Sequence, residues 1–178
     1  MKRSVIWIFL LLVTVFPDTG IAQDEKPGDT TRQFLLKAAR EIIESAGNVA
    51  LITQDAKGTP QIRTMDPFSP EKDFTVWLAT NPSSRKVTQI KNNPLVTLYY
   101  SDKNDQGYVV IHGTAELVDD QREKDLRWKN EWKDFYTDRT DDYLLIKISP
   151  LYLEVINYSR GLSGDPKTWQ PAMVRFRE

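Results

Sequence analysis

Apolar residues between Thr31 and Ala46 recur every three or four positions, which is typical of a helix with one buried face. This face carries Phe34, Leu35, Ala38, Ile42, Ile43 and Ala46. The residues Asp29–Thr31 are three candidate N-caps, and Gly47 follows the last apolar position as a helix-ending residue. We therefore expect an amphipathic helix whose Phe34, Ala38 and Ile42 pack on the elements that follow.

Six later segments have the β-branched and aromatic content of strands. They are Val49–Thr53, Pro60–Met65, Phe74–Ala79, Leu95–Ser101, Tyr108–Val118 and Tyr143–Asn157, the last interrupted at Pro150. The turn-forming sequences Asp55–Gly58 and Asp102–Gly107 join two pairs of these strands into predicted hairpins. Closure into a barrel would leave no sheet edge unpaired. The pattern thus predicts a mainly β fold, a six-stranded antiparallel barrel.

Two short helices complete the predicted domain. Ser83 or Ser84 caps a helix that Pro94 ends, and Gln121–Trp132 has helical spacing. The sequence contains no internal repeat and no linker, so one β domain with peripheral helices over residues 31–157 accounts for it. Residues 158–178 are expected to form a C-terminal tail.

The first 22 residues have the composition of a secretory signal peptide. Lys2 and Arg3 precede the apolar run Val5–Phe16, and the small residues of Gly20–Ala22 form a cleavage site. The run is shorter than the roughly 20 residues that a membrane span needs. We expect Sec-type export to the periplasm or the medium with cleavage after Ala22, followed by a flexible lead-in over residues 23–30. The alternative is an uncleaved anchor.

Composition excludes several kinds of site. With 24 Lys and Arg against 25 Asp and Glu, the net charge of −1 does not suit a protein that coats nucleic acid or an anionic membrane. The absence of Cys excludes disulfides and Cys-ligated metals, and the single His excludes any site with two imidazoles. We therefore expect no nucleic-acid partner and, after signal cleavage, no membrane association.

Several polar and aromatic residues have a structural interpretation. Asp119–Asp120 predicts a helix cap and Asp141–Asp142 a turn, so we expect no metal site there. His112 lies within a strand, where a packing or hydrogen-bonding role is expected. The aromatic stripe of Trp128, Trp132, Phe135 and Tyr136 predicts a core or interface.

The segment Ala79–Val87 is the strongest candidate for binding chemistry. It places Thr80, Ser84, Arg85 and Lys86 where a strand ends and a helix begins. A helix start offers N–H groups and the positive end of the helix dipole to an anion, and basic side chains add charged hydrogen bonds. The segment predicts a phosphate site. The alternative is a capped surface helix with solvated basic residues.

A second candidate segment is Arg63–Phe68, which ends another predicted strand. Arg63 has no evident role in a sheet of apolar neighbours. Two cationic sites on two strand ends can clamp one phosphate from two sides, so the two segments together strengthen the prediction.

Together these segments resemble the pyridoxamine 5′-phosphate oxidase-like split barrels. The flavin-phosphate segment of that family is similar to Thr80–Asn81, Ser84–Lys86, Gln89–Ile90, Asn92–Pro94 and Val96. Tyr108–Glu116 is similar to the family's long strand, and Asn130–Tyr136 is similar to its general stress protein branch. The resemblance covers residues 31–157 and implies an antiparallel split β-barrel of the FMN-binding type.

The resemblance also implies roles for individual residues. Arg63, Arg85 and Lys86 would hold the FMN phosphate, together with Ser84 of the same segment. The flavin ring and ribityl chain would meet two groups of residues, Thr64, Met65, Asp66, Pro67 and Phe68 in the first and Ala79 and Thr80 in the second. Tyr108 stands where relatives present a polar side chain to the flavin, often from the partner subunit. The family further implies a homodimer with cofactor sites at its interface.

One departure from the family limits the expected activity. Its oxidases hold the phosphate of pyridoxamine phosphate with an Arg and a His after the last strand, whereas Tyr158–Gly164 contains no His. We therefore do not expect oxidation of that vitamin, and neither the small-molecule substrate nor a catalytic residue follows from the sequence.

Three functions stay open at this point. The first is an exported FMN-dependent oxidoreductase, in which the cofactor carries the electrons. The second is a non-catalytic carrier that binds flavin, haem or a deazaflavin on the same barrel. The third is an exported structural protein that binds no cofactor. A visible absorbance spectrum separates them.

Overall fold

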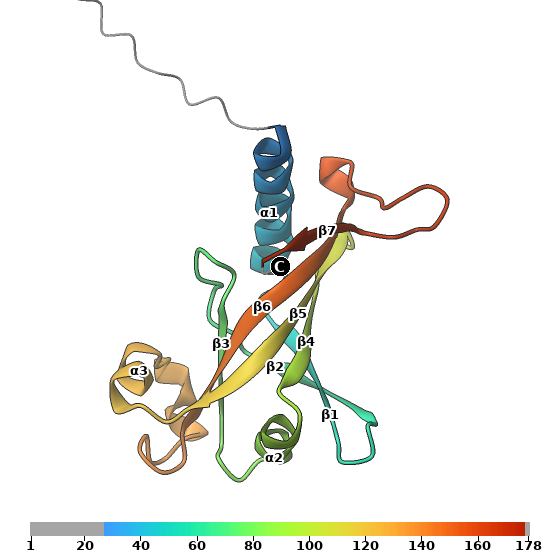
Figure 1. Cartoon of the computed structure of the whole chain (residues 1–178). Coiled ribbons are helices and arrows are strands. Elements are labelled where there is room, and N and C mark those ends of the chain that lie inside the picture. The colour runs from blue at the N-terminus through green and yellow to red at the C-terminus, as the bar shows by residue number, and fades with distance from the viewer. Residues whose placement is uncertain (1–26, 177–178) are drawn as a thin grey trace, which may run out of the picture.

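A computed structural model describes residues 27–176 of the chain (Figure 1). Its helices are α1 (Pro27–Ala46), α2 (Arg85–Asn92) and α3 (Gln121–Leu126), with the 3-10 turns η1 (Asn130–Asp134) and η2 (Tyr158–Arg160). Its strands are β1 (Val49–Gln54), β2 (Pro60–Met65), β3 (Val76–Thr80), β4 (Leu95–Ser101), β5 (Gly107–Val118), β6 (Leu144–Asn157) and β7 (Ala172–Arg175). The expected signal peptide lies outside the described residues. Within them, no helix is both long and apolar enough to cross a membrane.

All seven strands belong to one antiparallel sheet, which confirms the predicted mainly β class. The hydrogen-bonded order is β2-β1-β4-β5-β6-β3, and β7 pairs with β6. The sheet is not closed, because β2 and β3 at its two ends form no ladder with each other. A single bridge, Pro67 to Leu78, brings the chain after β2 to β3. Pro67 has no N–H to donate, so a ladder cannot continue through it.

The sheet buries its inner face against α1 at one end and α2 at the other (Figure 1). Ala38 and Ile42 of α1 are buried in the core, as the helical spacing predicts, and α2 contributes Ile90. Phe34 is an exception, because its side chain is 43% exposed. The next two residues of α1, Leu35 and Leu36, pack against the core instead.

Three boundaries differ from those expected. Residues 27–30 of the expected flexible lead-in belong to α1, where Pro27 suits a first turn because its missing N–H would have no helical partner. The expected C-terminal tail, residues 158–178, contains η2 and the seventh strand, β7. β6 is continuous through Pro150, because a register shift at His112 and Gly113 of β5 accommodates the proline.

The predicted helix Gln121–Trp132 is instead two elements, α3 and η1. Asp120 caps α3 as expected, accepting a hydrogen bond from the N–H of Glu123 at 3.0 Å. The helix ends early because Arg127 turns toward the sheet, where its guanidinium lies 3.7 Å from the ring centre of Trp77. Tertiary contacts therefore override the helical spacing.

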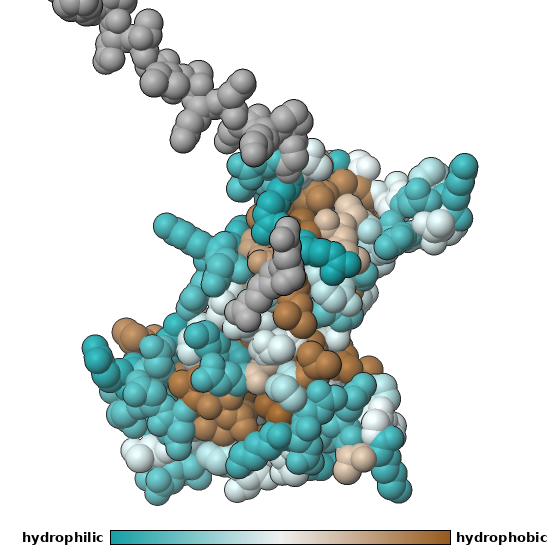
Figure 2. Space-filling view, in the orientation of Figure 1, coloured by the Kyte–Doolittle hydropathy of each residue, from teal (hydrophilic) through white to brown (hydrophobic). Residues whose placement is uncertain are grey.

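The face shown in Figure 2 is not uniformly polar. Apolar side chains gather above α2 and beside α3, with polar side chains around them. These two helices flank the region in which the candidate site lies.

Candidate functional site

A cavity of about 620 Å³ opens where four elements meet. The ends of β2 and β3, the start of α2 and the turn η1 surround it. Its lining residues are Thr64, Met65, Asp66, Ala79, Thr80, Asn81, Ser84, Lys86, Glu131, Trp132, Phe135 and Tyr136. The volume is in the range of small-molecule and cofactor sites.

One wall of the cavity is built from hydroxyls and a lysine. Thr80 ends β3, and its buried hydroxyl accepts a hydrogen bond from Nζ of Lys86 at 2.9 Å. The hydroxyls of Thr80 and Ser84 lie 2.9 Å apart and share one hydrogen bond. Ser84 occupies the N-cap position of α2 but makes no side-chain cap. The positive end of this helix therefore faces the cavity without a side-chain cap.

Three cationic side chains gather beside this wall without a carboxylate. Within residues 27–176, Arg63, Arg85 and Lys86 form no ion pair. Burial lowers the pKa of Lys86, and the charges of Arg63 and Arg85 lower it further. Burial and the neighbouring charge of Arg85 likewise lower the pKa of Arg63. The three charges repel one another, so an anion bound among them would relieve that repulsion.

The opposite wall is aromatic and belongs to η1 and the residues after it. Trp132 is buried, and its Nε1 donates to Oδ2 of Asp66 at 2.9 Å. Nζ of Lys129 donates to Oδ1 of the same carboxylate at 2.5 Å and to the carbonyl of Pro67 at 2.8 Å. Burial, and then the charge of Asp66, raise the pKa of Tyr136 to about 12. The hydrogen bonds to Asp66 thus connect this aromatic wall to the end of β2.

Most of the residues singled out from the sequence meet at this cavity. Seven of them line it, namely Thr64, Met65, Asp66, Ala79, Thr80, Ser84 and Lys86. Arg63 and Arg85 lie close enough to Lys86 to lower its pKa. Three others, Pro67, Phe68 and Tyr108, do not line it.

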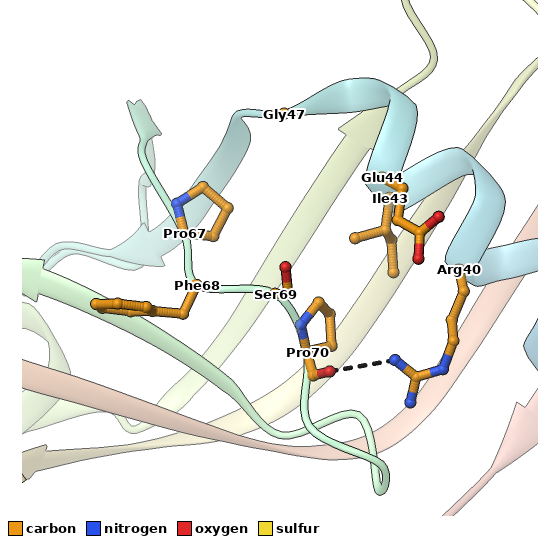
Figure 3. Close-up of a pocket in the computed structure, with 8 residues that line it drawn as sticks. All are labelled: Arg40, Ile43, Glu44, Gly47, Pro67, Phe68, Ser69 and Pro70. Atoms are coloured by element: carbon orange, nitrogen blue, oxygen red, sulfur yellow. Dashed lines mark hydrogen bonds between the residues drawn. The ribbon is translucent and has the colours of Figure 1, made fainter. Parts of the chain in front are cut away.

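Pro67 and Phe68 line a second cavity of about 110 Å³, between α1 and the segment after β2 (Figure 3). There Arg40 donates hydrogen bonds to the carbonyls of Pro70, Glu71 and Lys72. The Phe68 ring also packs edge-on against Trp132, with ring centres 5.3 Å apart. Phe68 therefore supports the aromatic wall from behind.

Tyr108 lies away from the cavity within one chain. It is near the start of β5, whereas the cavity is at the other end of the sheet. Its ring stacks on Tyr99 of β4, with centres 5.6 Å apart. Both side chains are on the outer face of the sheet, opposite the core, because the residues beside them in each strand point inward.

Five lining residues lie in segments that carry the family resemblance but were not predicted as site residues, namely Asn81, Glu131, Trp132, Phe135 and Tyr136. The last three belong to the aromatic stripe, which predicted a core or an interface. Trp132 is indeed part of a buried cluster, but Phe135 is exposed. The spacing of the aromatic residues does not predict the cavity, because the contact between Trp132 and Asp66 spans 66 residues.

Comparison with known proteins gives one family. The family model described as "Pyridoxamine 5'-phosphate oxidase like" matches residues 36–155. A curated pyridoxine/pyridoxamine 5′-phosphate oxidase from Crocosphaera subtropica is 33% identical over 103 residues, which are 56% of this chain and 47% of that protein. The match thus spans about half the length of this relative.

Two solved structures have a similar fold. General Stress Protein 26 from Bacillus anthracis is 28% identical, with a TM-score of 0.63 over 78% of this chain and 96% of its own. A protein related to general stress protein 26 from Clostridium acetobutylicum is 23% identical, with a TM-score of 0.66 over 81% of this chain and 95% of its own. The second likeness concerns the fold alone.

Proposed function

Since this chain belongs to the pyridoxamine 5′-phosphate oxidase-like family, we propose that it binds FMN in the 620 Å³ cavity and acts as a flavin-dependent oxidoreductase. One observation carries the proposal. Three cations, Arg63, Arg85 and Lys86, stand together at the open start of α2 without a carboxylate partner in residues 27–176. Arg63 and Lys86 are partly buried and Arg85 is exposed, so like charges lie close together at the border of the cavity, where a phosphate dianion would compensate them.

The residues present fit FMN at both ends of the cavity. Lys86, Arg85 and Arg63 would bind the phosphate. Of the two hydroxyls of Thr80 and Ser84, the one that does not donate to the other would donate to a phosphate oxygen. Trp132 and Tyr136 would shield the flavin ring from water on the opposite side. The bound flavin supplies the electron transfer, while the chain binds, orients and covers it.

The apolar outer face of the sheet supports a homodimer. Ile62 of β2 is 69% exposed, and Leu95 and Tyr99 of β4 are also exposed on this face. Exposed apolar patches of this kind mark association sites. We propose that two copies meet through this outer face, which would place Tyr108 near the partner's cofactor site and explain its distance from its own cavity.

Export of the protein is also proposed, from the sequence of residues 1–22. Because Sec export carries unfolded chains, FMN would then bind after translocation. The site should therefore load from free FMN, which a reconstitution experiment can follow.

The visible absorbance of the purified protein, after incubation with FMN and gel filtration, tests the proposal. A retained flavin spectrum supports it, and anaerobic bleaching by a nicotinamide donor supports the oxidoreductase. A retained flavin that no donor reduces favours the carrier. A Soret band after incubation with haem, or a retained deazaflavin in place of FMN, changes the cofactor. A protein that retains none of them contradicts the proposed function.

A further inference from the structure

Arg63 is held by three neutral acceptors, two from β1 and one from α2. Its Nη1 donates to Oγ1 of Thr53 at 2.6 Å and lies 3.4 Å from the carbonyl oxygen of Leu51. Its Nη2 donates to Oε1 of Gln89 at 2.8 Å. The Thr53 hydroxyl in turn donates to the same Oε1 at 2.6 Å. Three side chains thus form a closed ring of hydrogen bonds.

The ring connects the two halves of the cationic cluster. Gln89 lies on α2, four residues after Arg85, so both side chains are on the same side of the helix. Arg63 belongs to β2, and Thr53 belongs to the adjacent strand β1. Thr53 is 1% exposed and Gln89 8% exposed, so neither can move without breaking buried hydrogen bonds. The position of Arg63 relative to Arg85 and Lys86 is therefore set by Gln89.

The neutrality of these acceptors has a second effect. A carboxylate at the position of Gln89 would also hold Arg63, and would do so more strongly. It would, however, cancel the positive charge that an incoming anion needs. An amide fixes the guanidinium and leaves its charge uncompensated.

We propose that Gln89, supported by Thr53, is a positioning residue that orients Arg63 toward the cofactor phosphate and keeps its charge available. This inference rests on the proposed FMN site. It assigns Gln89 no contact with the ligand. The amide acts only through the arginine that it holds.

The test compares FMN with riboflavin, which has the same ring and lacks the phosphate. Both are titrated by fluorescence quenching into the wild type, Gln89→Glu and Asn92→Asp. The control places the same extra negative charge on the exposed end of α2, outside the ring. Gln89→Glu is expected to weaken FMN about tenfold to a hundredfold and to leave riboflavin within about twofold, because the new carboxylate compensates the charge of Arg63 that the phosphate would otherwise use. Asn92→Asp should change neither.

Equal weakening of both flavins by Gln89→Glu would overturn the inference, because it would show a structural role only. The inference would also be overturned if Gln89→Glu and Asn92→Asp bound FMN with equal affinity. If Gln89→Glu does not fold, Thr53→Val and Thr53→Ser decide. Val removes the hydroxyl and should weaken FMN alone, whereas Ser restores it and should recover wild-type affinity.

A wrong assignment of the FMN site would give a different result in the same titrations. If the wild type binds FMN and riboflavin equally, the cavity holds no phosphate, and the proposed phosphate site is wrong before any variant is considered. If the wild type prefers FMN and Gln89→Glu keeps that preference, only the role of Gln89 is wrong.

Discussion

Thr80 links the polar side chains on one wall of the cavity. Its hydroxyl is buried at the end of β3, accepts from Lys86 and shares a hydrogen bond with Ser84. A lysine held in this way loses rotational freedom before any ligand arrives, which reduces the entropy cost of binding. This wall of the cavity is therefore largely organised within the single chain.

The first prediction concerns Lys86. Replacing it with Ala should weaken FMN by about 2–3 kcal/mol, or roughly 30- to 150-fold, because one charged partner of the phosphate is lost. Riboflavin should bind nearly as before. Fluorescence titration of both flavins measures the difference.

Lys91→Ala is the matched control, since Lys91 is an exposed lysine in the last turn of the same helix. It should bind both flavins normally. Equal weakening of FMN and riboflavin by Lys86→Ala would show that Lys86 supports the fold rather than the phosphate. An unchanged FMN affinity would mean that the clamp is wrongly assigned.

The sequence could indicate that Ser84 and Lys86 lie together where a strand ends and a helix begins, but it could not indicate the residues that position Arg63. Ser84 and Lys86 lie in one short motif whose chemistry is local. Gln89 is in the same motif, but its partners Thr53 and Arg63 are 36 and 26 residues away, so only the folded chain reveals the contact. The aromatic stripe includes Trp132, but the sequence does not predict the hydrogen bond from its Nε1 to Asp66.

At the scale of elements, η1 depends on one carboxylate from a distant strand end. The second prediction is that Asp66→Ala loosens η1, because Lys129 and Trp132 both lose their acceptor. Since Asp66 is 48% exposed, solvent screens its ion pair with Lys129. We therefore expect FMN binding to weaken by only about 1 kcal/mol. FMN should dissociate about fivefold faster, which stopped-flow fluorescence measures.

Asp134→Ala provides the comparison, because Asp134 is an exposed carboxylate of η1. Its flavin dissociation rate should equal that of the wild type. The pKa of Tyr136 offers an independent readout. Removing the negative charge of Asp66 should lower it, and an unchanged tyrosine titration would contradict the contact.

The sequence predicted elements with strong local periodicity better than those set by tertiary contacts. The core strands and α2 were found from alternation and capping. β7 was missed because it has only four residues and lies after a Gly- and Pro-containing stretch, and its pairing with β6 is not a local property. α3 ends early because Arg127 packs on Trp77, which helical spacing does not register.

At the scale of the whole molecule, the third prediction tests the dimer. Leu95→Glu places a charge on the proposed interface and should yield a monomer with weakened FMN binding, since Tyr108 of the partner would be lost. Sedimentation velocity gives the mass. Leu126→Glu is the control, because Leu126 is 75% exposed on α3, outside that face, and should leave the dimer intact. A wild type that sediments as a monomer would contradict the proposal.

The fourth prediction concerns export. If export and cleavage after Ala22 occur as proposed, N-terminal sequencing of the protein from its native host should begin at Gln23. Intact Met1 in a soluble cytoplasmic fraction would contradict export. A chain with intact Met1 in the membrane fraction would favour the uncleaved anchor.

Two strands pair with different parts of the same edge of β6. β3 pairs with residues 144–148 of this strand, and β7 pairs with residues 152–155. β7 has only four residues, and residues 158–171 separate it from β6. Until β7 has paired, the second half of the β6 edge has free N–H and C=O groups that can pair with another chain. The folding step at which this protein is most exposed to aggregation is therefore the docking of β7 on β6.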